Sequence, residues 1–123
     1  MNPGLTKTYV AEGAIAASTI VKAGSAEGFV ARAGAAADAI LGVAERLNAD
    51  DREPVDIIHS GIADVRLGGT VAYGDFLTAD ASGQAIKAAP AAGVNAQVAG
   101  KALTPGVVGD IIPILITLTQ IQG

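Results

Sequence analysis

Residues 110–121 read DIIPILITLTQI, and this stretch decides the fold class. Its apolar side chains fall on alternating positions: Ile112, Ile114, Ile116 and Leu118 share one face, and Pro113, Leu115, Thr117 and Thr119 share the other. Period-two alternation of β-branched residues is typical of a strand packed on a core. Proline has no amide hydrogen to donate, so we expect Pro113 at a sheet edge or a bulge. A long strand near the end of the chain therefore points to an all-β protein.

Working outward from this strand, short apolar runs recur between glycines along the whole chain. Short strands at such spacing predict a small β-barrel or β-sandwich in a single domain. The stretch TADASGQAI, residues 78–86, predicts a hairpin that turns at Ala81-Ser82-Gly83. The other expected strands are 19–23, 28–32, 55–60, 63–67, 84–88 and 96–103. The sequence shows no internal repeat and no second domain.

One segment, AAADAILGVAERLN at residues 35–48, fits two structures. As a helix it would place Ile40, Val43 and Leu47 on one face, and its composition favours helix. As a strand it would run over 40–45 and end in an acidic loop. Gly42 weakens the helix, so we favour the strand.

Composition excludes several classes of function. The chain of 123 residues fits one domain, and its lack of cysteine excludes disulfides and thiolate metal sites. A formal net charge of -4 with scattered Lys and Arg argues against a nucleic-acid partner and a basic membrane surface. The N-terminus lacks the pattern of a signal peptide, so we expect synthesis in the cytoplasm.

The residues that could carry chemistry do not form a recognisable site. The single histidine, His59, adjoins Ser60, but neighbours on a strand face opposite sides and cannot pair directly. Asp50, Asp51 and Glu53 lack the spacing and the glycine of a calcium loop. We therefore expect no catalytic residue, no metal, no cofactor and no small-molecule substrate.

Three stretches resemble the capsid decoration, or head cement, proteins of tailed phages. They are AILGVAE at 39–45, GIADVRLGGTVAYGDFLTADASGQAI at 61–86 and VAGKALTPGVVGDIIPILI at 98–116. The Ala-rich stretch 88–93 departs from the family pattern. The resemblance implies a small β-barrel-like, or β-tulip-like, single domain. It also implies a structural protein on the outer surface of the virion. Its partner would be the major capsid protein, whose neighbouring subunits it clamps on the expanded head, commonly as a homotrimer.

The family commonly contacts the capsid through an N-terminal arm, and residues 1–12 have a composition that suits one. We expect residues 13–123 to form the barrel-like decoration domain. The predicted capsid-binding arm comprises Asn2, Pro3, Gly4, Leu5, Thr6, Lys7, Thr8, Tyr9 and Val10. Leu5 and Tyr9 would be its anchors, because they are its largest apolar groups. The alternative is a first strand paired within its own domain.

The oligomer interface is expected on the face of the last strand that bears Leu115, Thr117 and Thr119. A second functional class is a barrel-sandwich carrier module of the biotinyl or lipoyl type. Such a module needs a lysine at a hairpin tip, whereas Lys87 follows the predicted hairpin. A small hydrolase domain is the third class considered.

Overall fold

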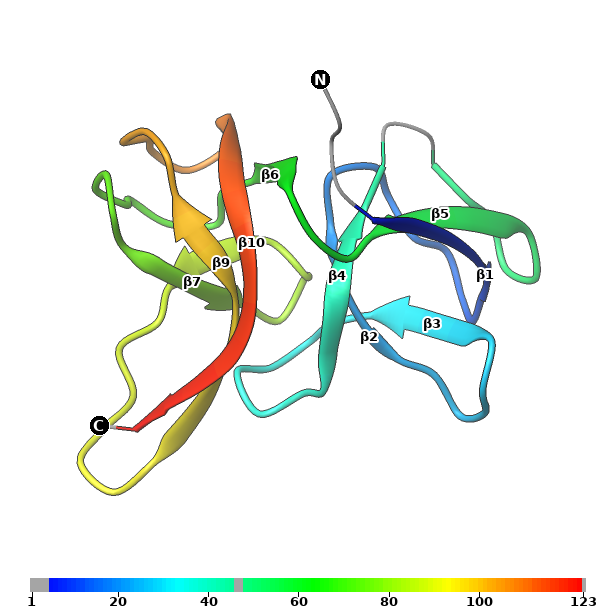
Figure 1. Cartoon of the computed structure of the whole chain (residues 1–123), viewed down its shortest axis with the longest axis horizontal. Helices are drawn as coiled ribbons and strands as arrows, with labels where there is room; N and C mark the ends of the chain where they lie inside the picture. Colours follow the sequence, from blue (N-terminus) through cyan, green and yellow to red (C-terminus); the bar gives the residue numbers. More distant parts are fainter. Residues whose placement is uncertain (1–4, 46–47, 123) are drawn as a thin grey trace.

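The computed structural model describes residues 5–45 and 48–122, and strands are the only extended regular structure in those ranges (Figure 1). This result confirms the expectation of an all-β protein. The strands are β1 Thr6–Ala11, β2 Ile20–Ala23, β3 Phe29–Arg32, β4 Ile40–Ala44, β5 Pro54–Ile58, β6 Ile62–Arg66, β7 Phe76–Ala79, β8 Ala85–Lys87, β9 Asn95–Ala102 and β10 Ile111–Gln122. They form two groups, which we call the first module (β1–β5) and the second module (β6–β10).

The first module is a closed barrel in the order β1-β3-β2-β4-β5. Closure comes from β1, which pairs with β5 in antiparallel register and with β3 in parallel at Val10 and Ala11. The interior is filled by small and β-branched side chains, including Val21, Val30 and Ile57. The ambiguous segment is the strand β4, so the helical alternative is wrong.

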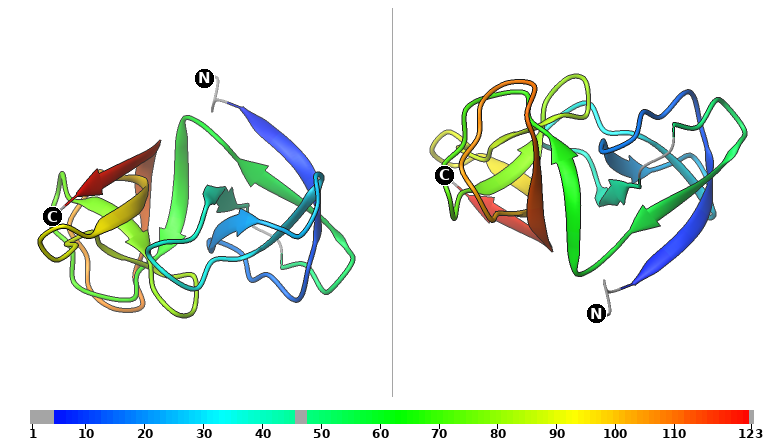
Figure 2. Two further views of the ribbon diagram at one scale, coloured as in Figure 1. Left: turned by 90° about the horizontal axis from the view of Figure 1, so that it is seen from below. Right: turned by 90° about the horizontal axis from the view of Figure 1, so that it is seen from above.

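The second module is a five-stranded sheet in the order β6-β10-β9-β7-β8. A single parallel bridge between Leu67, just after β6, and Ala85 in β8 brings its two outer strands together. Figure 2 shows the two modules lying next to each other along the long axis of the molecule.

The second module repeats the first, which corrects the expectation that the chain holds no repeat. The antiparallel pair β1·β5 corresponds to β6·β10, and the pairs β2·β4 and β2·β3 correspond to β7·β9 and β7·β8. The registers agree as well: Val21 lies opposite Gly42, and Leu77 lies opposite Gly100. The parallel contact of Ala11 with Val30 returns as the bridge between Leu67 and Ala85.

Backbone contacts outside the strands repeat in the same way. An isolated bridge joins Ile15 to Ala49 in the first module, and its counterpart joins Val71 to Gly106. Two turns of the first module use non-glycine residues at positive φ, Ser18 at 60° and Arg52 at 71°. The corresponding positions in the second module are Gly74 at 90° and Gly109 at 91°. The two modules therefore share one chain path, including its two left-handed turn positions.

The last strand departs from the expected alternation at a bulge. β10 pairs with β9 in one register up to Ile116 and in another from Thr119, so one extra residue lies between them. Ile112, Ile114 and Ile116 are buried as expected, but Leu118 lies in the bulge and is 41% exposed.

Pro113 lies in an interior strand, so the expectation of an edge or bulge position is wrong. Its carbonyl accepts a hydrogen bond from the amide of Leu103, which follows the end of β9. Residues in a hydrogen-bonded antiparallel pair normally exchange two bonds. The bond that Pro113 cannot donate would go to Leu103, so it is missing just past the end of β9 and not within the ladder.

The two modules form one body because the outer side of the first packs on the second. Ile20, Val43 and Ile58 point away from the interior of the first barrel and belong to the cluster of buried side chains that fills the second module. Backbone bonds cross the junction as well. The amide of Ile20 donates to the carbonyl of Gly83, and the amide of Arg66 donates to the carbonyl of Ser18.

Candidate functional site

The segment expected to be a free arm forms β1 from Thr6 onward. Five residues, Thr6 to Val10, pair with β5, which fits the strand propensity of Thr, Tyr and Val. Leu5 precedes the strand, is 62% exposed, and bonds through its carbonyl to the amide of His59. Residues 2–4 lie outside the described ranges. The structure therefore gives the alternative arrangement, a first strand inside its own domain.

β1 and the end of β5 bring together three polar side chains that sequence spacing did not connect. The hydroxyl of Tyr9 lies 2.8 Å from Nε2 of His59, and Nδ1 of His59 lies 2.8 Å from the carbonyl oxygen of Leu41. A carbonyl only accepts, so Nδ1 carries a hydrogen and, in neutral histidine, Nε2 accepts from the tyrosine. The ammonium of Lys7 lies 5.2 Å from the centre of the Tyr9 ring.

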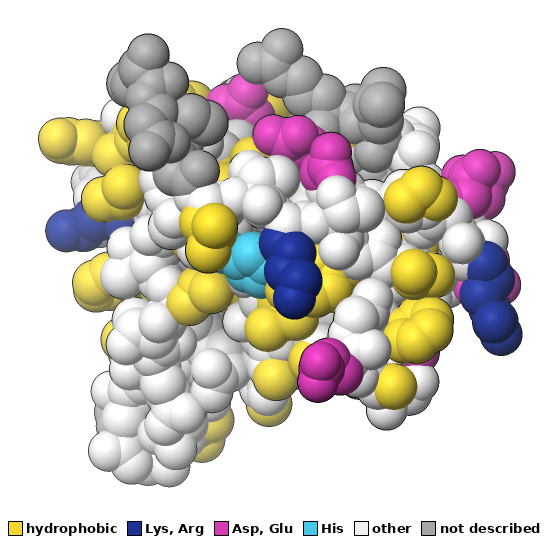
Figure 3. All heavy atoms as spheres, turned by 45° about the vertical axis from the view of Figure 1, so that its right-hand side comes forward, with side chains coloured by type: hydrophobic (Ala, Val, Ile, Leu, Met, Phe, Trp, Pro, Cys, Tyr) yellow, Lys and Arg dark blue, Asp and Glu magenta, His cyan; other side chains and the backbone are white. Residues whose placement is uncertain are grey.

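Lys7 and Tyr9 line an opening beside β1 in the first barrel, which we call the mouth. Only Val10 and Ala11 of β1 pair with β3, so the remainder of β1 leaves a gap on that side. A hollow of about 420 Å³ occupies it. Its lining residues are Lys7, Tyr9, Ala23, Gly24, Ala26, Glu27, Gly28, Phe29 and Leu41. Figure 3 shows the histidine of this region, in cyan, beside a basic side chain and among apolar ones.

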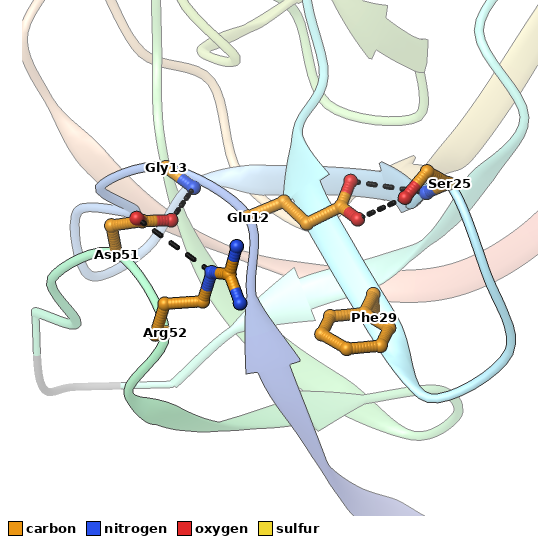
Figure 4. A pocket seen from close by; sticks show the side chains of 6 residues that line it. All are labelled: Glu12, Gly13, Ser25, Phe29, Asp51 and Arg52. Atoms are coloured by element: carbon orange, nitrogen blue, oxygen red, sulfur yellow. Dashed lines mark hydrogen bonds and ion pairs between the residues drawn. The ribbon is translucent and has the colours of Figure 1, made fainter.

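A second hollow, of about 430 Å³, lies on the other side of Phe29 and is drawn in Figure 4. Its carboxylates are occupied by local hydrogen bonds. Asp51 accepts from the amide of Gly13 at 2.8 Å, and Glu12 accepts from both the hydroxyl and the amide of Ser25. These two bonds from Ser25, the hydroxyl first, hold the pKa of Glu12 below its ordinary value. These bonds connect the residues just after β1 to the loops that contain Ser25 and Asp51.

An exposed row of side chains crosses the outer face of the second sheet. Four residues in direct register across β6, β10, β9 and β7 make it up: Ile62, Leu115, Lys101 and Phe76. The three apolar members are 37–43% exposed, and the ammonium of Lys101 lies 5.5 Å from the centre of the Phe76 ring. We call this set the exposed row.

The predicted interface residues of the last strand do not share a continuous face. Leu115 belongs to the exposed row, but the bulge follows it, and Thr119 lies opposite the buried Val98 on the other side of the sheet. Thr117 stands next to the bulge and is half-buried.

Other expected sites stay apart in the structure. Within residues 5–45 and 48–122, no group of three or more His, Asp and Glu side chains is arranged to hold a metal ion. In the hairpin turn Ala81 and Ser82 are exposed and Gly83 is buried against the first module, while Lys87 lies on β8 opposite Leu77. A carrier lysine at an exposed tip is therefore not present at this hairpin. The same described ranges contain no helix long and apolar enough to span a bilayer.

Comparison with solved structures gives a likeness that extends over nearly the whole chain. No family model and no curated protein sequence matches the chain. Among solved structures, it is similar to the N base of head fiber gp8.5 of bacteriophage phi29, with a TM-score of 0.68 at 16% sequence identity. The match covers 97% of this chain and 98% of that one. The likeness shows that both chains share the same fold over almost their whole lengths.

Proposed function

We propose that this protein is a structural component of a phage head, bound to the outer surface of the capsid and acting without enzymatic chemistry. The observation that carries the proposal is the shared fold, over nearly the full length, with the base of a phage head fiber. The sequence resemblance to head decoration proteins points to the same class from separate evidence.

The surface of the molecule supports a binding role. The exposed row places Ile62, Phe76 and Leu115 together on a flat sheet face, and such apolar patches mark interaction sites. In the second hollow, the carboxylates of Asp51 and Glu12 already accept hydrogen bonds from Gly13 and Ser25. We expect the protein to act as a homotrimer that bridges neighbouring major capsid subunits. Several weak contacts then act together, and this would stabilise the head.

The N-terminal segment stays a candidate for capsid contact, as a strand of the barrel and not as a free arm. Residues from Thr6 onward are committed to the barrel, so they would meet the capsid through exposed side chains of a formed strand. Leu5, just before the strand, is the most exposed large apolar residue in this segment.

The test is addition of the purified protein to expanded, undecorated heads built from the major capsid protein encoded nearest to its gene. We expect cosedimentation at saturating stoichiometry and a higher temperature of head disruption. Heads that bind no protein in this assay would refute the proposal. Mass spectrometry of protein from cells is the parallel control, since a lipoyl or biotinyl adduct on lysine would support the carrier class instead.

A further inference from the structure

The internal repeat gives the chain two copies of one surface. The copy in the first module is buried against the second module, and the copy in the second module is exposed. In the first module, Ile20, Val43 and Ile58 are at most 9% exposed because they pack on the second module. The corresponding positions of the second module are Phe76, Lys101 and Leu115, in the exposed row. Register establishes the correspondence, because Val43 lies opposite Ile58 as Lys101 lies opposite Leu115.

The surface of the second module that contacts the first module also has a counterpart, which lies exposed in the first module. On the second module, Ala63, Ala99 and Gly83 are buried beneath or beside the first module. Their counterparts in the first module line the mouth: Lys7 corresponds to Ala63, Leu41 to Ala99 and Gly28 to Gly83. These three residues are exposed or half-buried.

The contact inside the chain is therefore of the head-to-tail kind, with two different surfaces meeting. Such a contact leaves one unused surface of each kind at the two ends of the chain, and these can join separate copies. We propose that the exposed row of one copy docks on the mouth of the first barrel of a second copy, repeating the contact between its own two modules. This goes beyond the proposed function and concerns self-association without any capsid.

Charge and size agree with this contact. The exposed row carries Lys101 on β9, and Asp64 lies two positions after Ile62 on β6, whereas the mouth carries Glu27 and Lys7. Each surface thus offers both signs to the other, which favours pairing in one orientation. The hollow of about 420 Å³ is large enough to admit the Phe76 ring.

The repeat also predicts which atoms meet. Ile20 lies beside Gly83 within the chain, bonded through its amide, so Phe76 should lie beside Gly28 of the next copy. The carbonyl of Gly28 already accepts a bond from the amide of Val10, so we expect this contact to be made by the side chain of Phe76. Glu27 is exposed beside Gly28 and accepts a substitution without disturbing the positive φ of the glycine.

Cross-linking separates this arrangement from a symmetric one, and the absence of native cysteine leaves no background. Phe76→Cys and Glu27→Cys are purified separately, mixed, and treated with a short thiol-reactive cross-linker. We expect cross-linked dimers in the mixture and none in either single variant alone. Self-cross-linking of Phe76→Cys would show two exposed rows facing each other and overturn the proposal, as would a mixture that gives no product.

A second experiment measures mass by light scattering at tens of micromolar protein. The native chain is expected to be oligomeric and Leu115→Asp monomeric, with unchanged circular dichroism. Val107→Asp is the matched control, because Val107 is 55% exposed outside the exposed row, and this variant should stay oligomeric. A monomeric native chain, or an oligomeric Leu115→Asp, would overturn the proposal. Neither outcome depends on binding to heads, so the proposed function is tested separately.

Discussion

Replacing Gly100 with alanine should test both the packing of the sheet and the repeat. A Cβ atom built on Gly100 would lie 2.5 Å from the carbonyl oxygen of Leu115 and 3.0 Å from Cδ1 of Ile114. Gly42 approaches the carbonyl oxygen of Ile58 in the corresponding way. Both glycines let two paired strands come together, so alanine at either position should destabilise the fold, and Gly42 adds the strain of a φ of 158°.

The size of the effect follows from this geometry. An ordinary contact requires β9 and β10 to separate by roughly 1 Å, which weakens the flanking ladder bonds at about 1 kcal/mol each. Overpacking a well-packed interior costs about 1–3 kcal/mol in addition. We therefore expect each variant to lose about 2–4 kcal/mol of unfolding free energy, or about 10 °C in Tm for a domain of this size.

Urea and thermal unfolding followed by circular dichroism measure this loss. Gly34→Ala is the matched control, because a Cβ there meets nothing closer than 3.8 Å and Gly34 is exposed. This variant should lie within about 0.5 kcal/mol of the native protein. A change smaller than 1 kcal/mol in Gly100→Ala would refute the close approach of the two strands.

Three further outcomes follow from particular contacts. Tyr9→Phe removes the hydroxyl that meets His59 and should cost about 1 kcal/mol in urea unfolding; an unchanged midpoint would argue against that bond. Deleting residues 2–10 removes most of β1 and should leave the chain unfolded by circular dichroism, whereas a folded product would restore the free-arm interpretation. Ser25→Ala should raise the pKa of Glu12 in an NMR titration. Folding lowers the pKa of Glu12, so ionised Glu12 stabilises the folded protein above the unfolded pKa, and this stabilisation is lost as pH falls through the folded pKa. The free energy of unfolding of Ser25→Ala should therefore decrease less on acidification than that of the native protein.

Much of the strand pattern could be predicted from the sequence because it is local. Alternation along β10 and the turn at Gly83 are each set by a few neighbouring residues. The bulge after Ile116 is not, because it depends on how β9 lies alongside. The burial of Leu118 was mispredicted for this reason.

The repeat escaped detection because its two copies preserve geometry more than residue identity. Val30 and Ala85 are 55 positions apart, whereas Gly42 and Gly100 are 58 apart, since the loops differ in length. The left-handed turn residue is Arg52 in one copy and Gly109 in the other, so the usual glycine signal is lost. The cluster at the mouth was equally hidden, because Tyr9 and His59 meet across 50 residues of chain.

Corresponding side chains differ between the two modules according to whether their surface is covered by the other module. Where the first module covers the second, the receiving residues are small or apolar, as at Ala63 and Ala99. At the uncovered mouth, the corresponding residues are Lys7 and Leu41, whose long side chains partly fill the opening. An amphipathic lysine can shield apolar surface with its stem while its charge stays in water, and Lys101 does the same over Phe76 in the exposed row. The mouth and the exposed row are thus both apolar areas shielded by a lysine side chain. A partner can displace the lysine ammonium into water and bury the apolar area beneath it, at little electrostatic cost.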